Sequence, residues 1–356
     1  MGKLKKRVII LIAAHLIGLG GFRYWQANNY EFFPPTAEEK MAALGEAHWG
    51  VVRVPVANLN AENRFSASVV TQALMGMPVR LLHKDGWYEV QLPDGYTGWL
   101  HGSQFVRMTA GELGAWNARE KLIVTAMSAP VVSTSDDQVV VSLTMGAHVA
   151  LVNVADEGYV VALPDGREGL VAKEAVAELK VHQEVERVRR LQPGFGMALQ
   201  ATAQELLGQS YQWGGTSAQA MDCSGFVKTV YWMHDMILPR DAGQQAYIGE
   251  RFYSVAQAQP GDLHFFGSVG KNYRARVSHV GLSTGAGRFI HALGDVHRAS
   301  LNAEDATYDA YEKRRYLWSV RLRTEKFDEA CWQTTKDNGF YQTPPRPLIE
   351  CRLSKS

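Results

Sequence analysis

Residues 213–226 read WGGTSAQAMDCSGF, and this stretch decides the fold of the C-terminal half of the chain. A glycine-rich loop that begins at Trp213 is followed by Cys223, which opens an amphipathic helical stretch. A cysteine at a helix N-terminus faces unpaired backbone N–H groups and the positive end of the helix dipole, and both lower the pKa of the thiol. The position therefore predicts a nucleophile, whereas a cysteine in isolation is more commonly a buried structural residue.

Two histidines favour the catalytic interpretation. His279 and His291 each lie six residues from Gly285, which opens the turn sequence Gly285-Ala286-Gly287. If the flanking strands fold back symmetrically about Gly285, the two imidazoles are cross-strand partners on one face of a sheet. One imidazole can then take the proton of the Cys223 thiol, while the other imidazole orients the first. The remaining histidines after residue 22 are predicted to be surface or core residues: His48, His83, His101, His148, His182, His234, His264 and His297.

An alternative hypothesis makes the same three side chains, Cys223, His279 and His291, ligands of zinc, because thiolate and imidazole are its usual ligands. Their spacing in the sequence does not decide between a metal site and a nucleophilic site. No CxxC pair is present among the three cysteines of the chain.

The sequence around this stretch predicts an α+β domain, with helices first and strands afterwards. The expected helices are 197–207 and 223–233, and the expected strands are 262–266, 278–284 and 288–293.

The preceding part of the chain contains a repeat. Met75-Gly76 recurs as Met145-Gly146, and residues 92–95 (LPDG) recur as residues 163–166. Short strand-like runs separated by turn sequences surround both copies, so we predict two small all-β barrels. A helical linker is expected between them, from Thr109 to Leu122. The copies differ after the turn, where Tyr96 and Trp99 of the first copy become Arg167 and Leu170 in the second.

Six motifs of the C-terminal region resemble, in order, those of the NlpC-type, papain-like cysteine peptidases of bacterial cell walls. The resemblance covers residues 197–323, and the two β repeats resemble the bacterial SH3-like domains that often precede such a peptidase. It implies that Cys223 is the nucleophile, His279 the general base and His291 the orienting residue. The motifs are residues 211–215 (YQWGG), 222–226 (DCSGF), 238–242 (LPRDA), 259–263 (QPGDL), 278–281 (SHVG) and 289–292 (FIHA).

Within that family the chain resembles the γ-D-glutamyl-L-diamino acid endopeptidases of murein recycling, which cut peptides that start with a free L-Ala. The resemblance implies a murein peptide, L-Ala-γ-D-Glu-diamino acid, as partner and no cofactor. The pocket must hold an ammonium ion, and a buried cation needs a carboxylate. Asp241 matches the motif position that supplies one, and Ser224, Tyr96 and Glu62 resemble the other specificity positions.

These candidate binding residues have structural alternatives, namely helix capping and packing in a barrel core. Asp241 and Asp222, the second also a candidate binding residue, are alternatively helix caps. Tyr96 and Trp99 are alternatively part of a barrel core. A third hypothesis for the whole chain is a wall-binding protein whose papain-like domain is inert.

Composition sets the wider limits. The chain has 356 residues, 46% of them hydrophobic, and a net charge of +1, which favours two or three folded domains and excludes general disorder. A balanced charge gives no attraction to nucleic acid. Four cations from Lys3 to Arg7 precede an apolar run from Val8 to Phe22, which predicts an export signal, more readily cleaved than kept as an anchor, and a periplasmic or cell-envelope protein. Contact with a membrane is expected only through this segment, if it is uncleaved.

The predicted organisation is therefore multidomain, with two small all-β SH3-like barrels followed by an α+β papain-like catalytic domain. In the C-terminal tail, Cys331 and Cys351 are expected to form a disulfide in an oxidising compartment. The predicted parts are a signal peptide or anchor (1–26), an N-terminal helical segment (27–52) opened at Thr36, SH3-like domains (53–108 and 121–181), the peptidase domain (195–324) and the tail (325–356).

Overall fold

The computed structural model describes residues 44–322 and 332–348 of the chain. Residues from Glu46 onward belong to one compact unit, separate from the unit of Met1–Gly45. The expected signal segment and the expected disulfide between Cys331 and Cys351 lie outside the described residues. Of the helices within the described part, none is both long enough and apolar enough to span a bilayer.

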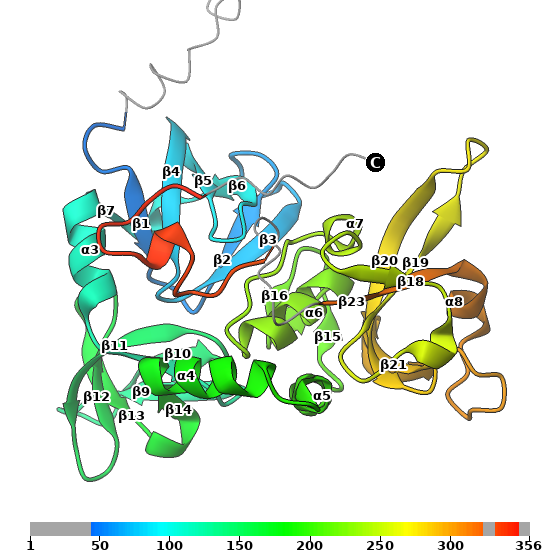
Figure 1. The fold of residues 1–356 in the computed structure, drawn as a ribbon. Coiled ribbons are helices and arrows are strands. Elements are labelled where there is room, and N and C mark those ends of the chain that lie inside the picture. The colour runs from blue at the N-terminus through cyan, green and yellow to red at the C-terminus, as the bar shows by residue number, and fades with distance from the viewer. Residues whose placement is uncertain (1–43, 323–331, 349–356) are drawn as a thin grey trace, which may run out of the picture. The chain divides into compact units, whose positions relative to one another are not determined.

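The first β-unit is a seven-stranded sheet with the strand order β3-β2-β6-β5-β4-β1-β7, drawn in blue and cyan in Figure 1. It begins earlier than expected, because Trp49 lies in a strand and not at the end of a helix. That strand pairs with β4 on one side and β7 on the other, so all its residues are buried. The strands are β1 (Trp49–Val52), β2 (Val56–Asn60), β3 (Val69–Leu74), β4 (Pro78–Asp85), β5 (Trp87–Gln91), β6 (Thr97–Leu100) and β7 (Phe105–Met108).

The second β-unit repeats this architecture, with the order β10-β9-β13-β12-β11-β8-β14. Each strand occupies the place of the strand seven numbers earlier, so the sequence repeat is a repeat of topology. Gly95 and Gly166 both have a positive φ, of 85° and 86°, in the turn of the repeated LPDG sequence, where other residues would be strained. The strands are β8 (Lys121–Val124), β9 (Ser128–Val132), β10 (Val139–Thr144), β11 (His148–Val154), β12 (Tyr159–Ala162), β13 (Glu168–Val171) and β14 (Val176–Glu178).

Two helices connect the sheets. The helix expected between the repeats is α3 (Ala110–Ala118), which begins at a capping box of Thr109 and Glu112. A further helix, α4 (Leu179–Arg190), was not expected from the sequence. It is amphipathic, but the apolar stripe of Val181, Val185 and Val188 is exposed, and the residues it buries are Glu186 and Arg190.

The third sheet belongs to the C-terminal domain and has the order β16-β17-β15-β22-β21-β20-β19-β23-β18. Helix α6 (Cys223–Trp232) is buried along its whole length and packs against β20 and β21. The other elements are α5 (Phe195–Glu205), β15 (Ser210–Tyr211), β16 (Thr216–Ser217), β17 (Ala220–Met221), α7 (Ala242–Gln245), β18 (Glu250–Phe252), β19 (Leu263–Val269), β20 (Ala275–Gly285), β21 (Arg288–Leu293), β22 (Asp295–Ser300), α8 (Ala310–Arg315) and β23 (Tyr316–Arg321).

Both β-units contact the C-terminal domain directly. The Thr216 backbone N–H donates to Gln72 Oε1 of the first β-unit at 2.9 Å. The Trp232 indole donates to the Gly146 carbonyl of the second at 3.0 Å. The tail segment 332–348, red in Figure 1, packs on the first β-unit, where the Phe340 ring meets Trp49 edge to face at 5.0 Å. These contacts fix the glycine-rich loop and α6 against the two β-units.

Candidate active site

Cys223 is the first residue of α6, and Asp222 caps the helix by accepting from the Gly225 N–H at 2.8 Å. The thiol is only 8% exposed. Burial and the Asp222 carboxylate raise the pKa of the Cys223 thiol to about 12, although the backbone N–H groups of Val280 and Ser224 act in the opposite direction. The expected lowering of this pKa is therefore wrong for the resting protein, because desolvation outweighs the helix terminus. The thiol needs a base to become a nucleophile.

The two histidines meet, but not in the predicted register. In the pairing of β20 with β21, Leu282 lies opposite Ile290, and extending that register places His291 opposite Gly281 and not opposite His279. The pairs of Leu282 with Ile290 and of Ser283 with Phe289 are centred on Ala286, which has a positive φ, and not on Gly285. Since residues two apart on a strand share a face, His279 and His291 are diagonal neighbours on one face.

The two imidazoles are hydrogen-bonded, with His279 Nε2 and His291 Nδ1 2.8 Å apart. A Cβ at Gly281 would lie 3.3 Å from the His291 Cβ, so a larger residue there would crowd the pair. Both rings are buried, at 5% and 0% exposed. Because His279 Nε2 is committed to His291, its Nδ1 is the nitrogen left to serve the thiol, whose sulfur lies against the backbone of the next residue, Val280.

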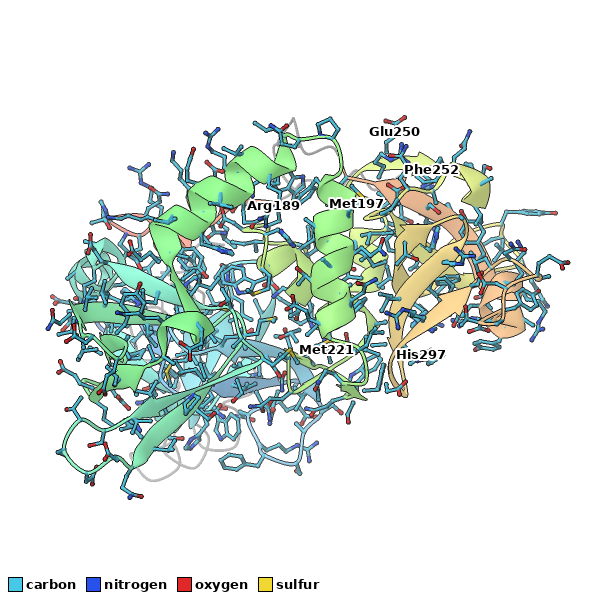
Figure 2. All side chains as sticks on the ribbon, turned by 90° about the horizontal axis from the view of Figure 1, so that it is seen from below. Arg189, Met197, Met221, Glu250, Phe252 and His297 are labelled. Carbon is cyan, nitrogen blue, oxygen red and sulfur yellow. The ribbon has the colours of Figure 1, made fainter. Side chains whose placement is uncertain are left out.

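A third histidine and a carboxylate continue this chain of contacts. His297 lies directly opposite His291 in the pairing of β21 with β22, and their Nε2 atoms are 3.0 Å apart. The other nitrogen of His297, Nδ1, is 2.8 Å from Asp295 Oδ1. Figure 2 labels His297 on this strand. The prediction that His297 is an ordinary surface or core residue is wrong, and a signal for it was available in its spacing of six residues from His291.

The carboxylate at the end of this relay determines the tautomer of every ring in it. Asp295 can only accept, so His297 carries its proton on Nδ1 and presents a bare Nε2. His291 then donates from Nε2 and accepts at Nδ1, which requires a proton on His279 Nε2. His279 Nδ1 is left without a proton, which is the state of a general base.

Burial also keeps the two inner rings neutral. It lowers the pKa of His279 to about 3, with Arg315 and His297 adding to the effect, and it lowers the pKa of His291 to about 2. The resting site therefore holds a neutral thiol and neutral imidazoles at neutral pH.

Asp222 has a second role beyond capping. It accepts from the Gly214 N–H at 2.9 Å and forms a buried ion pair with Arg240, which is 2% exposed. Arg240 also donates to Ser224 Oγ at 2.9 Å and to Thr71 Oγ1 at 3.1 Å. The expectation that Asp222 is a helix cap is confirmed, and the side chains of both Asp222 and Ser224 are engaged within the protein.

Asp241 and Tyr96 are in contact, although Tyr96 belongs to the first β-unit and Asp241 to the C-terminal domain. Their side chains are hydrogen-bonded, and the pKa of Tyr96 is raised by burial and then by the Asp241 carboxylate. Burial raises the pKa of Asp241 despite the nearby Arg240 guanidinium, yet the side chain remains exposed to solvent. Glu62 lies on an exposed loop of the first β-unit, where its carboxylate pairs with Arg64 at 3.0 Å. An accessible carboxylate thus lies beside Arg240, which contacts the helix cap of Cys223.

Tyr211 is a further residue at the site to which the sequence assigned no role. Burial, followed by Cys223 and Asp222, raises the pKa of its hydroxyl to about 12. The hydroxyl therefore stays protonated and can donate a hydrogen bond near the sulfur.

The zinc hypothesis gains no support from this geometry. Within the described ranges, one group of side chains could hold a metal ion, and it consists of His279, His291 and Glu312 without Cys223. These side chains already have partners, since the imidazoles bind each other and Glu312 accepts from Arg315 at 2.7 Å.

Two protein-family models match this chain, one in the C-terminal domain and one in the first β-unit. The model of the NlpC/P60 family matches residues 208–321, and that of the bacterial dipeptidyl-peptidase Sh3 domain matches residues 59–105. A γ-D-glutamyl-L-lysine dipeptidyl-peptidase of Bacillus cereus is 27% identical over 261 residues, which cover 69% of this chain and 75% of that protein. A probable endopeptidase p60 of Listeria innocua is 44% identical over 95 residues, which cover 27% of this chain and only 19% of the Listeria protein.

Solved structures of similar fold also cover most of the chain. The crystal structure of an NlpC/P60 family protein from Bacillus cereus superposes with a TM-score of 0.65 at 23% identity, over 77% of this chain and 99% of that one. The predicted fold class, with a sheet-rich SH3-like region before an α+β domain, is confirmed.

Proposed function

Because this chain carries an NlpC/P60 domain at residues 208–321 and a bacterial SH3 domain at residues 59–105, we propose that it is a cysteine peptidase. Its proposed substrate is a murein peptide with a free N-terminal L-Ala, cut between γ-D-Glu and the diamino acid. The observation that carries the proposal is the relay from Asp295 to His279, which leaves an unprotonated Nδ1 beside the helix that begins at Cys223.

The reaction follows from these positions. His279 Nδ1 takes the thiol proton as the Cys223 sulfur attacks the γ-carbonyl, and the carbonyl oxygen becomes an oxyanion. When the oxyanion collapses, the C–N bond breaks and His279 gives the proton to the leaving amine. A thioester remains. Water then loses a proton to His279, adds to the thioester carbonyl and releases the acid and the thiol.

Two groups can stabilise the oxyanion. The Cys223 backbone N–H enters none of the hydrogen bonds found among residues 44–322 and 332–348, so it is available as a donor. The protonated Tyr211 hydroxyl is the second candidate. Donors that are aligned in a water-poor site stabilise the transition state more than they do in water.

Selection of a free L-Ala is assigned to Asp241 and Tyr96. An ammonium group placed beside Asp241 would compensate a carboxylate whose pKa is raised by burial. The name of the Bacillus cereus relative, a γ-D-glutamyl-L-lysine dipeptidyl-peptidase, supports this specificity. Ser224, Asp222 and Glu62 stay predictions as binding residues. We also propose that the protein is exported to the periplasm or cell envelope, on the pattern of its first 22 residues.

The test is hydrolysis of L-Ala-γ-D-Glu-diaminopimelate and of the same peptide with an acetylated L-Ala, with products identified by mass spectrometry. We expect release of the diamino acid from the free peptide only, and loss of kcat/KM by about 10⁴-fold in Cys223→Ala. Activity that survives this substitution would refute the cysteine mechanism. Equal hydrolysis of both peptides would refute the role of Asp241, and loss of activity to a chelator would restore the zinc hypothesis.

A further inference from the structure

A second polar cavity lies away from the proposed active site. Its volume is about 240 Å³, and its walls come from the end of α3, the beginning of α4, both β-units and the tail segment 332–348. Cys223, His279, His291 and Asp241 are not among its lining residues. Figure 2 shows α4, with Arg189 labelled, in the same part of the molecule as the β-units. We refer to this space as the basic cavity.

The charge of the basic cavity is of one sign. Arg119, Lys121, Lys180 and Lys336 line it, and within the described parts of the chain its lining includes no Asp or Glu. Lys121 is the most buried of the four: burial, together with the charges of Arg119 and Lys180, lowers the pKa of its ammonium group to about 7. A buried cation without a carboxylate partner is costly, so the cavity has positive charge that the protein itself does not compensate.

Lys121 also shows that the cavity wall is rigid. Its Nζ donates to backbone carbonyls at the end of α3, with Asn117 O at 3.1 Å and Arg119 O at 3.3 Å. These bonds hold the cation at a helix C-terminus, where a positive charge is stabilised. The amino group is therefore held in place beside the cavity, and with a pKa of about 7 it is partly charged at neutral pH. The side chains of Arg119, Lys180 and Lys336 are exposed.

Three buried polar atoms in the lining have no partner among the described residues. They are Trp116 Nε1, His148 Nε2 and Tyr341 Oη. Trp116 and His148 are 5% and 2% exposed. The indole can only donate, the phenol can donate, and a neutral imidazole can present an N–H, so the three atoms are suited to a ligand that accepts hydrogen bonds.

The acidic groups found near the cavity have other partners. Glu184, whose carboxylate interacts with Lys336, is paired with Arg187 at 2.6 Å. Burial, followed by Asp235 and Asp94, raises the pKa of Tyr341. However, Asp235 accepts from the Thr335 hydroxyl at 2.6 Å, and Asp94 faces Lys228 at 2.9 Å. These carboxylates therefore do not neutralise the lysines and the arginine of the lining.

We propose that the basic cavity binds a small organic anion through its carboxylate or phosphate group, at a site distinct from the active site. A water molecule occupies about 30 Å³ of liquid, so 240 Å³ exceeds what a lone inorganic oxyanion fills and suits a ligand of monosaccharide size. Cations at the rim attract the anionic group, a bound anion favours the charged form of Lys121, and the unpartnered donors bind acceptor oxygens. The His148 ring stacks on Trp232 at 5.3 Å, so one wall of this site rests on the helix that begins at Cys223.

Isothermal titration calorimetry on the full chain tests this proposal at constant ionic strength. The probes are glucuronate and glucose 6-phosphate, with glucose as the neutral control of the same ring. We expect saturable one-to-one binding of at least one anion and binding of glucose at least tenfold weaker. The stronger of the two anions identifies the group, carboxylate or phosphate, that the site prefers. No saturable binding of either anion would mean that the cavity holds only solvent, and equal binding of glucose would mean that the anionic group is not recognised. Either result would overturn the proposal.

Two sets of variants locate the binding. Lys180→Met with Lys336→Met removes exposed rim cations, and we expect affinity to fall at least tenfold, whereas Lys271→Met on an exposed turn outside the cavity leaves it unchanged. Tyr341→Phe deletes a hydroxyl that has no partner, so we expect an unchanged Tm without ligand and weaker anion binding. Undiminished binding in the double variant would place the anion elsewhere. A Cys223→Ala protein should bind as the wild type does, so failure of the proposed peptidase activity would leave this result unaffected.

Discussion

The two β-units have the same strand order but different partners. In the first, the turn of the repeated LPDG sequence faces the catalytic domain, where Asp94 pairs with Lys228 of α6 at 2.9 Å. In the second, Asp165 of the equivalent turn pairs with Arg167 of its own unit and with Arg53 of the first. The first β-unit thus contacts α6, the helix that begins at Cys223, and the second β-unit contacts the first.

The residue two positions after that aspartate shows why only the first unit reaches the proposed substrate pocket. Tyr96 is hydrogen-bonded to Asp241, whereas Arg167 folds back onto Asp165. The copies also differ at the repeated glycine. A Cβ at Gly76 would lie 2.0 Å from the His148 carbonyl, and one at Gly146 would lie 2.6 Å from the Trp232 indole. The two β-units thus share one fold, and their different contacts give them different roles.

The largest expected effect separates the two equivalent aspartates. Asp94→Ala leaves Lys228 buried and unpaired, so we expect the free energy of unfolding to fall by about 3–5 kcal/mol. Asp165→Ala serves as the matched control. Its two arginine partners are 42% and 45% exposed and can turn to water, so about 1 kcal/mol is expected. Urea denaturation measures both, and equal losses would remove the distinction between the units.

Of the two β-units, the second should lose more stability in acid. His148 is 2% exposed, and burial lowers its pKa to about 3, from about 6.5 in the unfolded chain. The folded state therefore binds fewer protons, and stability is lost as the pH falls from 6.5 toward 3. Between pH 6.5 and 5 this histidine accounts for about 2 kcal/mol. We expect His148→Gln to reduce the loss on acidification by that amount, while His101→Gln, partly exposed in the first unit, does not. The free energies of unfolding of the three proteins at pH 6.5 and pH 5 test this prediction, and equal losses in the two variants would contradict it.

Removing one hydroxyl from the first unit should affect catalysis and not folding. Tyr96→Phe leaves Asp241 without its phenolic partner, and the loss of a hydrogen bond to a charged group is worth about 1.5–3 kcal/mol. We expect kcat/KM for the free peptide to fall about tenfold or more, with the effect in KM. Arg167→Ala, at the matching position, should leave the kinetics unchanged. A similar loss in both variants would contradict the division of labour.

The smallest effect is expected in the relay, which depends on neither β-unit. Asp295→Asn keeps the shape but no longer enforces a proton on His297 Nδ1, so part of the protein adopts the wrong tautomer at His279. Since Asp295 is exposed, we expect kcat to fall about threefold to tenfold with little change in KM. The pH profile of kcat supplies the second measurement. If Asp295 had only a structural role, the substitution would leave the shape of this profile unchanged.

Much of the site could be predicted from the sequence because its signals are local. Cys223 follows a glycine-rich loop and a capping aspartate, and the repeat identified Tyr96 as the position where the copies differ. The register of His279 and His291 could not be predicted, since their strand pairs are centred on Ala286, one residue after Gly285, and this moves the partner of each residue by two positions. His297 was missed because its partners lie on a neighbouring strand. The direction of the Cys223 pKa was wrong because burial is not visible in a single motif.

By itself, the sequence determined the order of the parts, the repeat, the helix that begins at Cys223 and the residue types able to perform nucleophilic catalysis. These depend on periodicity, capping and turn residues, which act within a few residues of the chain. Only the tertiary structure decided that Asp94 binds Lys228, that Asp295 orders three imidazoles and that four cations surround one cavity. Such pairings join positions far apart in the chain, and their energies depend on distance and on exclusion of water, which arise only when the sheets and helices pack.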